Sequence, residues 1–177
     1  MNWLGGQTVS ITFVNFVVFS CCTIAAFTDI RRRLIYNWTT YPAFLLVLTA
    51  LLLCTGIEIF SPESVVWTDR ICSISWFSAL SGLFVGILLT GIPYTLGQGG
   101  AGDVKLAAVI GLGLGFEAGL TALLIAYIIA FAWGMVLVLY GKCRHLAKPD
   151  VERKYHPIAI PMGAFFLCGV LYVFIFC

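Results

Sequence analysis

Charged residues are scarce in this chain of 177 residues, of which 10% are charged and 61% are hydrophobic. Soluble globular proteins carry about 25% charged residues and roughly 45–50% apolar ones. Ten basic and eight acidic side chains are too few to cover the surface of a water-soluble fold of this size. The composition therefore excludes a water-soluble monomer, a disordered chain and a nucleic-acid-binding module.

Paired cysteines and an early basic residue are also missing. The seven cysteines form no Cys-x-x-Cys pair, and the two histidines lack metal-ligand spacing, so we expect no metal site. The odd number of cysteines argues against a disulfide framework. No Lys or Arg precedes Arg31, so the basic start of a cleavable signal peptide is absent and we expect the first apolar segment to be retained.

Long uncharged runs fill most of the sequence. A helix needs about 20 apolar residues to cross a hydrocarbon layer of roughly 30 Å. The runs contain apolar residues all round rather than on one stripe, which is typical of helices in lipid. The sequence therefore predicts an all-α integral membrane protein, a bundle of six transmembrane helices in a single transmembrane domain over residues 1–177. The expected spans are 12–28, 40–57, 71–91, 104–119 (marginal in length), 120–140 and 158–176.

The basic residues predict the orientation of this bundle. With six spans, nine of the ten Lys and Arg residues share one side of the membrane, and Arg70 alone lies on the other. Basic residues concentrate on the cytoplasmic side of membrane proteins. The crowded side is then cytoplasmic, and both termini lie outside.

Two aspartates stand at the ends of uncharged runs on the predicted cytoplasmic side. Asp29 ends the first run, and Asp103 begins the fourth predicted span. A carboxylate near hydrocarbon is costly, and such residues are usually paired or functional. Each also has a simple structural interpretation: Asp29 as an interfacial charge beside the arginines 31–33, and Asp103 as a helix cap.

Four glycines in the six residues before Asp103, 97–102, favour a functional interpretation. Glycine permits close backbone approach, so an extended polypeptide substrate has room beside such a loop. Two adjacent carboxylates cannot both ionise easily and share a proton. One then takes a proton from water while the other polarises a scissile carbonyl. The pattern predicts an aspartic-protease dyad, with neither role assigned to a particular residue.

These residues resemble the type IV prepilin peptidases. Residues 100–106, Gly-Ala-Gly-Asp-Val-Lys-Leu, resemble the family's Gly-x-Gly-Asp-x-Lys-Leu signature. Residues 29–37 resemble its stretch of Asp, basic residues and Ile-Pro-Asn, and residues 160–163 with Gly169 resemble the start of its last helix. The resemblance implies Asp29 and Asp103 as the catalytic pair, Gly100 and Gly102 in the active-site loop, and Lys105 as a supporting residue.

The family resemblance also implies substrate and location. It implies a membrane aspartic peptidase that removes a short basic leader from prepilin-, pseudopilin- or preflagellin-like proteins at the cytoplasmic face of the cell membrane. Such substrates carry an apolar helix after the cut, which sits in the lipid bilayer beside the enzyme. We expect the arginines 31–33 to anchor the first helix to lipid phosphates rather than to contact the leader.

The chain departs from the family pattern in three places. Tyr36 stands where the family usually has proline, which leaves the turn after the basic cluster open, and Ala164 stands where a second proline often occurs near the last helix. The cytoplasmic segment with paired cysteines, found in the bifunctional members that also methylate the product, is not seen. We therefore expect peptidase activity only, as in the short forms that serve tight-adherence pili, with no S-adenosylmethionine and no other cofactor.

Three other functions stay open at this point. A proton- or ion-coupled transporter would also use membrane carboxylates and glycine-broken helices, but no inverted repeat is visible and both aspartates fall on one face. A presenilin-like intramembrane protease shares Gly-x-Gly-Asp. In a non-enzymatic pilus-assembly subunit the two aspartates would be caps, and changing either to asparagine would leave function largely intact.

Overall fold

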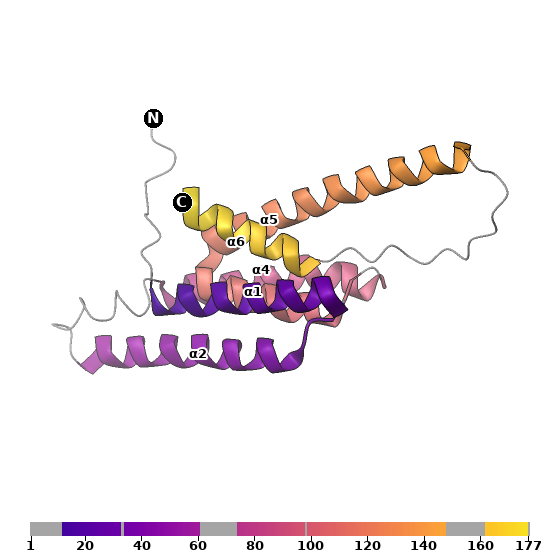
Figure 1. The fold of residues 1–177 in the computed structure, drawn as a ribbon. Helices are drawn as coiled ribbons and strands as arrows, with labels where there is room; N and C mark the ends of the chain where they lie inside the picture. The colour runs from indigo at the N-terminus through magenta and orange to yellow at the C-terminus, as the bar shows by residue number, and fades with distance from the viewer. Residues whose placement is uncertain (1–11, 33, 61–73, 98, 148–161, 177) are drawn as a thin grey trace, which may run out of the picture.

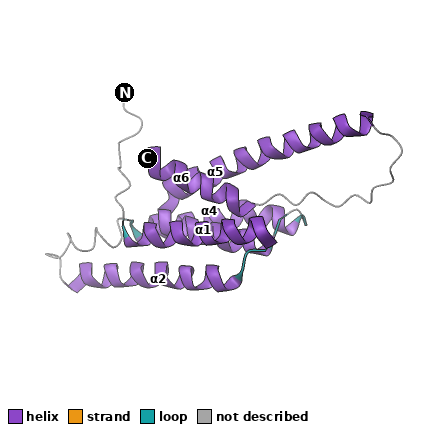
Figure 2. Cartoon of the chain, in the orientation of Figure 1, coloured by secondary structure: helices purple, strands orange, loops and turns teal. Residues whose placement is uncertain are grey.

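The computed structural model describes residues 12–32, 34–60, 74–97, 99–147 and 162–176, which form five helices and no strand (Figure 2). The predicted all-helical class is confirmed. Four helices are long and apolar enough to cross a membrane, as a multi-pass membrane protein requires, and the fifth is a shorter apolar helix. The helices are α1 (Phe13–Arg32), α2 (Asn37–Phe60), α4 (Trp76–Thr95), α5 (Ala101–Ala147) and α6 (Met162–Phe176).

The predicted count of six helices is not supported, because the described residues contain five. The difference lies in α5, whose 47 residues cover both predicted spans 104–119 and 120–140. Its apolar part, Ala101–Tyr140, has 40 residues and would measure about 60 Å if straight, twice the thickness of the hydrocarbon layer. The predicted end of the fourth span lay at residue 119, whereas the helical geometry breaks at Gly115 (φ 78°, ψ −174°).

At Gly115 the chain folds back on itself. A Cβ atom added at Gly119 would lie 3.1 Å from Cα of Gly111, although residues eight apart on a straight helix are about 12 Å apart. The break frees the backbone N–H of Phe116, which donates to Oγ of Ser78 on α4 at 3.0 Å. Helix α5 therefore has a first arm, residues 101–114, and a second arm, residues 116–147, which Figure 1 shows running back at an angle.

The first arm lies inside the bundle, and every residue from 106 to 115 is buried. Glycines bring its backbone close to α4. A Cβ at Gly82 would overlap the carbonyl oxygen of Gly111, and one at Gly86 would overlap that of Ala107. Association of helices in lipid depends on such close packing, because apolar burial gives little driving force there.

Helix α1 buries one stripe of side chains against this core. Its buried residues include Val14, Val18, Cys22 and Ala25, at the three- and four-residue spacing of a helix face. The next position on the same stripe is Asp29, which is 8% exposed. The helix therefore turns this carboxylate inward, while Arg31 and Arg32 are exposed.

The orientation of the bundle depends on residues outside the described part of the chain. Arg33, Arg70 and the basic residues 148–154 lie there, as do residues 1–11 and Cys177 at the two termini. The predicted placement of both termini outside is therefore not supported by the fold. The starts of the predicted spans 71–91 and 158–176 also fall outside the described residues.

Candidate active site

Asp29 lies where the end of α1 meets the start of α6. The backbone N–H of Gly163 donates a buried hydrogen bond to Oδ2 of Asp29 at 2.8 Å. Gly163 is the second residue of α6, so its N–H is one of the first four, which have no acceptor within their own helix. The carboxylate of Asp29 therefore satisfies a backbone group that would otherwise lack a partner in an apolar setting.

Asp103 begins the first arm of α5 and bonds to the residue before the helix. The N–H of Gly100 donates to its Oδ2 at 3.0 Å, and the N–H of Asp103 donates to the carbonyl oxygen of Gly100 at 3.0 Å. The bond from Gly100 to the carboxylate is the one that the third residue of a helix makes in a capping box, here with Asp in the place of the usual Glu or Gln. Asp103 is therefore the third residue of α5 rather than its N-cap, and this bond occupies one of its two carboxylate oxygens.

The two aspartates are far apart in the chain but lie at the same end of the bundle, where Gly102 packs against Ile35 of the connection that follows α1. Asp29 is buried and Asp103 is half-buried, and the charge of Asp29 reaches Asp103. In Figure 1 the end of α1 and the start of α6 meet at one end of the bundle, where α4 also ends. Two carboxylates on separate, packed helices can share a proton, which is the requirement for acid–base catalysis by a dyad.

The glycine loop owes much of its composition to packing. A Cβ at Gly102 would lie 2.7 Å from Cβ of Ile35, so this glycine lets the connection between α1 and α2 pack on the start of α5. Gly97 has φ +73°, a conformation that L side chains rarely adopt. A Cβ at Gly100 would lie 3.2 Å from Oδ2 of Asp103, the atom that accepts the N–H of Gly100. Packing and turn geometry therefore explain these three glycines.

Lys105 points to α2 rather than to a carboxylate. Its Nζ donates to Oδ1 of Asn37 at 2.7 Å and lies 4.8 Å from the ring centre of Tyr41. Asn37 is the first residue of α2 and the asparagine of the stretch that follows Asp29. The supporting residue predicted from the sequence therefore joins the segment carrying Asp103 to the one that follows Asp29.

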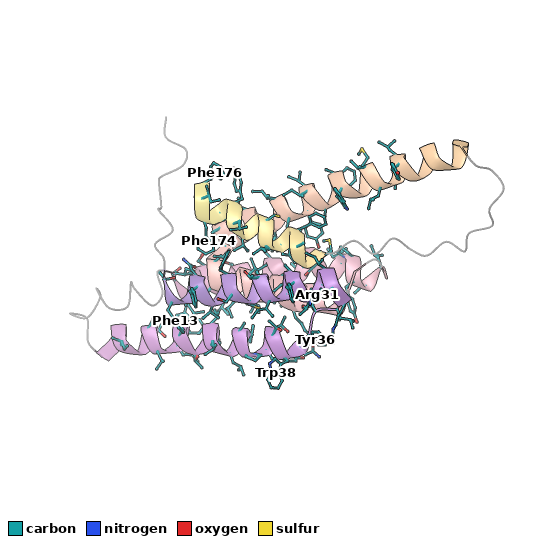
Figure 3. The ribbon with its side chains drawn as sticks, in the orientation of Figure 1. Phe13, Arg31, Tyr36, Trp38, Phe174 and Phe176 are labelled. Carbon is teal, nitrogen blue, oxygen red and sulfur yellow. The ribbon has the colours of Figure 1, made fainter. Side chains whose placement is uncertain are left out.

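The structure shows the turn at Tyr36, the position where the family usually has proline. Its carbonyl oxygen accepts the N–H groups of Thr39 and Thr40 at 3.0 and 3.4 Å, so it stands at the N-cap of α2. Its hydroxyl accepts a 3.0 Å hydrogen bond from Arg32. Arg31 covers the ring of Phe27 at 4.5 Å. Figure 3 shows Arg31 and Tyr36 at the same end of the bundle, far from Phe13.

Tyr127 on the second arm is a neighbour of the site that sequence reasoning missed. Its hydroxyl donates to the carbonyl oxygen of Leu89 at 3.4 Å, and it interacts electrostatically with Asp103. Leu89 lacks its usual helical donor because the residue four positions later, Pro93, has no N–H. The ring of Tyr127 also meets the ring of Phe166 of α6 edge-on, with ring centres 6.3 Å apart. In the sequence, Pro93 is the feature that indicates a carbonyl oxygen at Leu89 in need of another donor.

Among the described residues, no group of three or more His, Cys, Asp and Glu side chains could hold a metal ion. The arrangement offers two carboxylates, and each of them accepts a backbone N–H.

A comparison with protein families identifies the class. The model of the type IV leader peptidase family matches residues 16–135, more than half of the chain, and the chain belongs to this family. The match includes Asp29 and Asp103 but ends before α6. Membership implies a prepilin-type leader peptidase with a protein substrate, in a family of aspartic type. Neither the curated proteins nor the solved structures contain a match to the chain.

Proposed function

We propose that the chain is a membrane aspartic endopeptidase that cleaves the basic leader from prepilin- or pseudopilin-like substrates, or from preflagellin-like ones. Residues 1–177 act as a single transmembrane peptidase domain in this proposal, and Asp29 and Asp103 are its catalytic pair. The observation that carries the proposal is the placement of these two residues on separate helices that meet at one end of the bundle, where each carboxylate accepts a backbone N–H and the charge of Asp29 reaches Asp103.

The proposed reaction needs one proton shared by the pair. The ionised carboxylate removes a proton from water, whose oxygen then attacks the scissile carbonyl carbon. The protonated partner gives its proton to the carbonyl oxygen, and a tetrahedral intermediate forms. When this collapses, the C–N bond breaks, the amine leaves with a proton, and the leader keeps the new carboxyl group. Because the pair titrates as a unit, both side chains are required.

The proposed membrane topology follows from the fold-back at Gly115. If each arm of α5 crosses the membrane, the chain crosses six times, and both aspartates face the side where the basic residues gather. That side is the cytoplasm by the distribution of Lys and Arg. The active site would then lie at the cytoplasmic surface of the cell membrane, beside the junction between a leader and its apolar helix.

The substrate proposal uses the same geometry. A prepilin-like protein places its apolar helix in lipid and leaves the basic leader at the interface. Arg31 and Arg32 are exposed and contact Phe27 and Tyr36 of their own segment. This supports their proposed role as anchors to lipid phosphate, since a positive charge would repel a basic leader. If the two arginines do not contact the leader, neutralising the leader's charges one at a time should change the cleavage rate little.

Reconstituted enzyme tests the proposal. The purified chain in liposomes is incubated with a prepilin-like protein that has a basic leader, a glycine before the junction and an apolar helix. We expect a single cut after that glycine, identified by the mass and amino-terminal sequence of the product. A second substrate without the apolar helix should be cut far more slowly. If the first substrate stays intact, the transporter or assembly-subunit interpretation takes its place.

A further inference from the structure

We infer that Gly163 is a positioning residue of the active site, and that its backbone N–H holds the carboxylate of Asp29 in the orientation needed for hydrolysis. The inference rests on the proposed function and adds the start of α6 to the site. The hydrogen bond itself is buried and measures 2.8 Å between N and Oδ2. A carboxylate that receives a hydrogen bond from a fixed backbone group loses rotational freedom, and bonds of this charge-assisted kind are among the stronger hydrogen bonds in proteins.

Several contacts hold this donor in place. A Cβ at Gly163 would lie 3.2 Å from both the carbonyl oxygen of Ala25 and Cβ of Asp29. The backbone of α6 therefore rests directly on the turn of α1 that carries the carboxylate. At the other end of the two helices, Phe174 meets Phe19 edge-on with ring centres 6.1 Å apart. Helix α6 thus runs antiparallel to α1, and Figure 3 shows Phe174 toward the end of α1 opposite Arg31.

The second arm of α5 supports α6 from the other side. A Cβ at Gly169 would overlap the carbonyl oxygen of Ala122 on that arm. Phe166, which is 1% exposed, lies between these two glycines and packs against Tyr127. Helix α6 is therefore fixed between α1 and the second arm, so the position of the Gly163 N–H is set by packing rather than by the hydrogen bond alone.

The arrangement gives the two aspartates different surroundings. The hydrogen bond to Asp103 comes from Gly100, three residues away in its own segment, and it is exposed. The bond to Asp29 comes from another helix and is buried. A hydrogen bond to a charged group is stronger where water is excluded. A substitution at the start of α6 should therefore change kcat through the orientation of Asp29, while the loop around Asp103 keeps its structure.

A proline at position 163 tests the inference because it removes the N–H. The first turn of a helix tolerates proline, since its N–H groups have no acceptor within the helix. In reconstituted enzyme, Gly163→Pro should lower kcat by about 10- to 100-fold, the loss expected for a hydrogen bond to a charged group. KM should change less than threefold, because the substrate's own contacts are untouched.

Two further variants separate the lost donor from other effects of proline. Gly163→Ala adds a Cβ but keeps the N–H, and should retain clearly more of kcat than the proline variant. Met162→Pro places proline in the same turn without removing the donor, and should keep kcat within about threefold of wild type. Thermal unfolding in detergent shows whether each variant is folded.

Each outcome bears on a different claim. If wild type cleaves the substrate and Gly163→Pro does so with an unchanged kcat, the inference is wrong and the proposed function stands. The inference is also wrong if Met162→Pro or Gly163→Ala loses as much kcat as Gly163→Pro, or if Gly163→Pro does not fold while Met162→Pro does. If wild type itself leaves the leader attached, the proposed function fails and the inference fails with it.

Discussion

Lys105 and Asn37 join the start of α5 to the start of α2, through a hydrogen bond of 2.7 Å between Nζ and Oδ1. Lys105 lies two residues after Asp103, and Asn37 is the first residue of the helix that follows the Asp29 segment. The contact therefore links the two stretches that carry the aspartates. It is exposed, so solvent screens it and it contributes little to global stability.

A double-mutant cycle measures what this link does for cleavage. Lys105→Met and Asn37→Ala should each lower the cleavage rate by about three- to fivefold, which corresponds to roughly 1 kcal/mol. The double variant should be no slower than the slower single one, because both changes break the same contact. Thermal unfolding temperatures should differ little among the four proteins. Fully additive losses in rate would show that the two side chains act independently.

Gly115 should be the least replaceable of the helix-breaking positions in the described chain. Its φ of +78° costs an L residue about 1–2 kcal/mol, and an added Cβ would lie 2.6 Å from Oγ of Ser78. Gly115→Ala should therefore destabilise the protein by at least about 2 kcal/mol in thermal or denaturant unfolding in detergent.

Gly91→Ala is the matched control for that variant. Gly91 lies within α4, and an added Cβ there meets nothing within 4 Å. Alanine is a better helix former than glycine by about 1 kcal/mol, so this change should leave stability unchanged or raise it slightly. Equal effects of the two substitutions would contradict the fold-back at Gly115.

Tyr127 should stabilise the contact between α4 and the second arm through its hydroxyl. Tyr127→Phe leaves the carbonyl oxygen of Leu89 without this donor, while Pro93 cannot replace it. Hydrogen bonds between helices in membranes contribute about 0.6 kcal/mol on average, and a loss of that size is expected in unfolding experiments. Tyr172→Phe, at an exposed position on α6, is the control and should have no effect. An equal loss of unfolding free energy for Tyr172→Phe and Tyr127→Phe would contradict a stabilising role for the hydrogen bond to Leu89.

The helical class could be predicted from the sequence because long uncharged runs lie in a membrane as helices. The inward position of Asp29 was not predicted, because the apolar residues of the first run occur all round the helix and mark no single buried face. The structure shows that Asp29 continues the buried stripe formed by Val14, Val18, Cys22 and Ala25.

The features that were missed depend on contacts between distant segments. The bond from Gly163 to Asp29 and the partner of Lys105 require knowing which helix ends meet, and no local pattern gives that. The predicted count of six helices is not supported for a different reason. Uncharged runs show how much of the chain can lie in a membrane but not where a helix bends, and the bend at Gly115 depends on its conformation and on the support of Ser78.

Replacement of each aspartate by asparagine, followed by the leader-cleavage assay in liposomes, tests the central claim most directly. Asparagine keeps the size of the side chain but cannot exchange the proton. Asp29→Asn and Asp103→Asn should both be folded and leave the leader attached, with rates reduced by more than about 1,000-fold. Glu117→Gln, which neutralises an exposed carboxylate just beyond the bend at Gly115, should cleave at the wild-type rate. Near-normal cleavage by either aspartate variant would contradict the account.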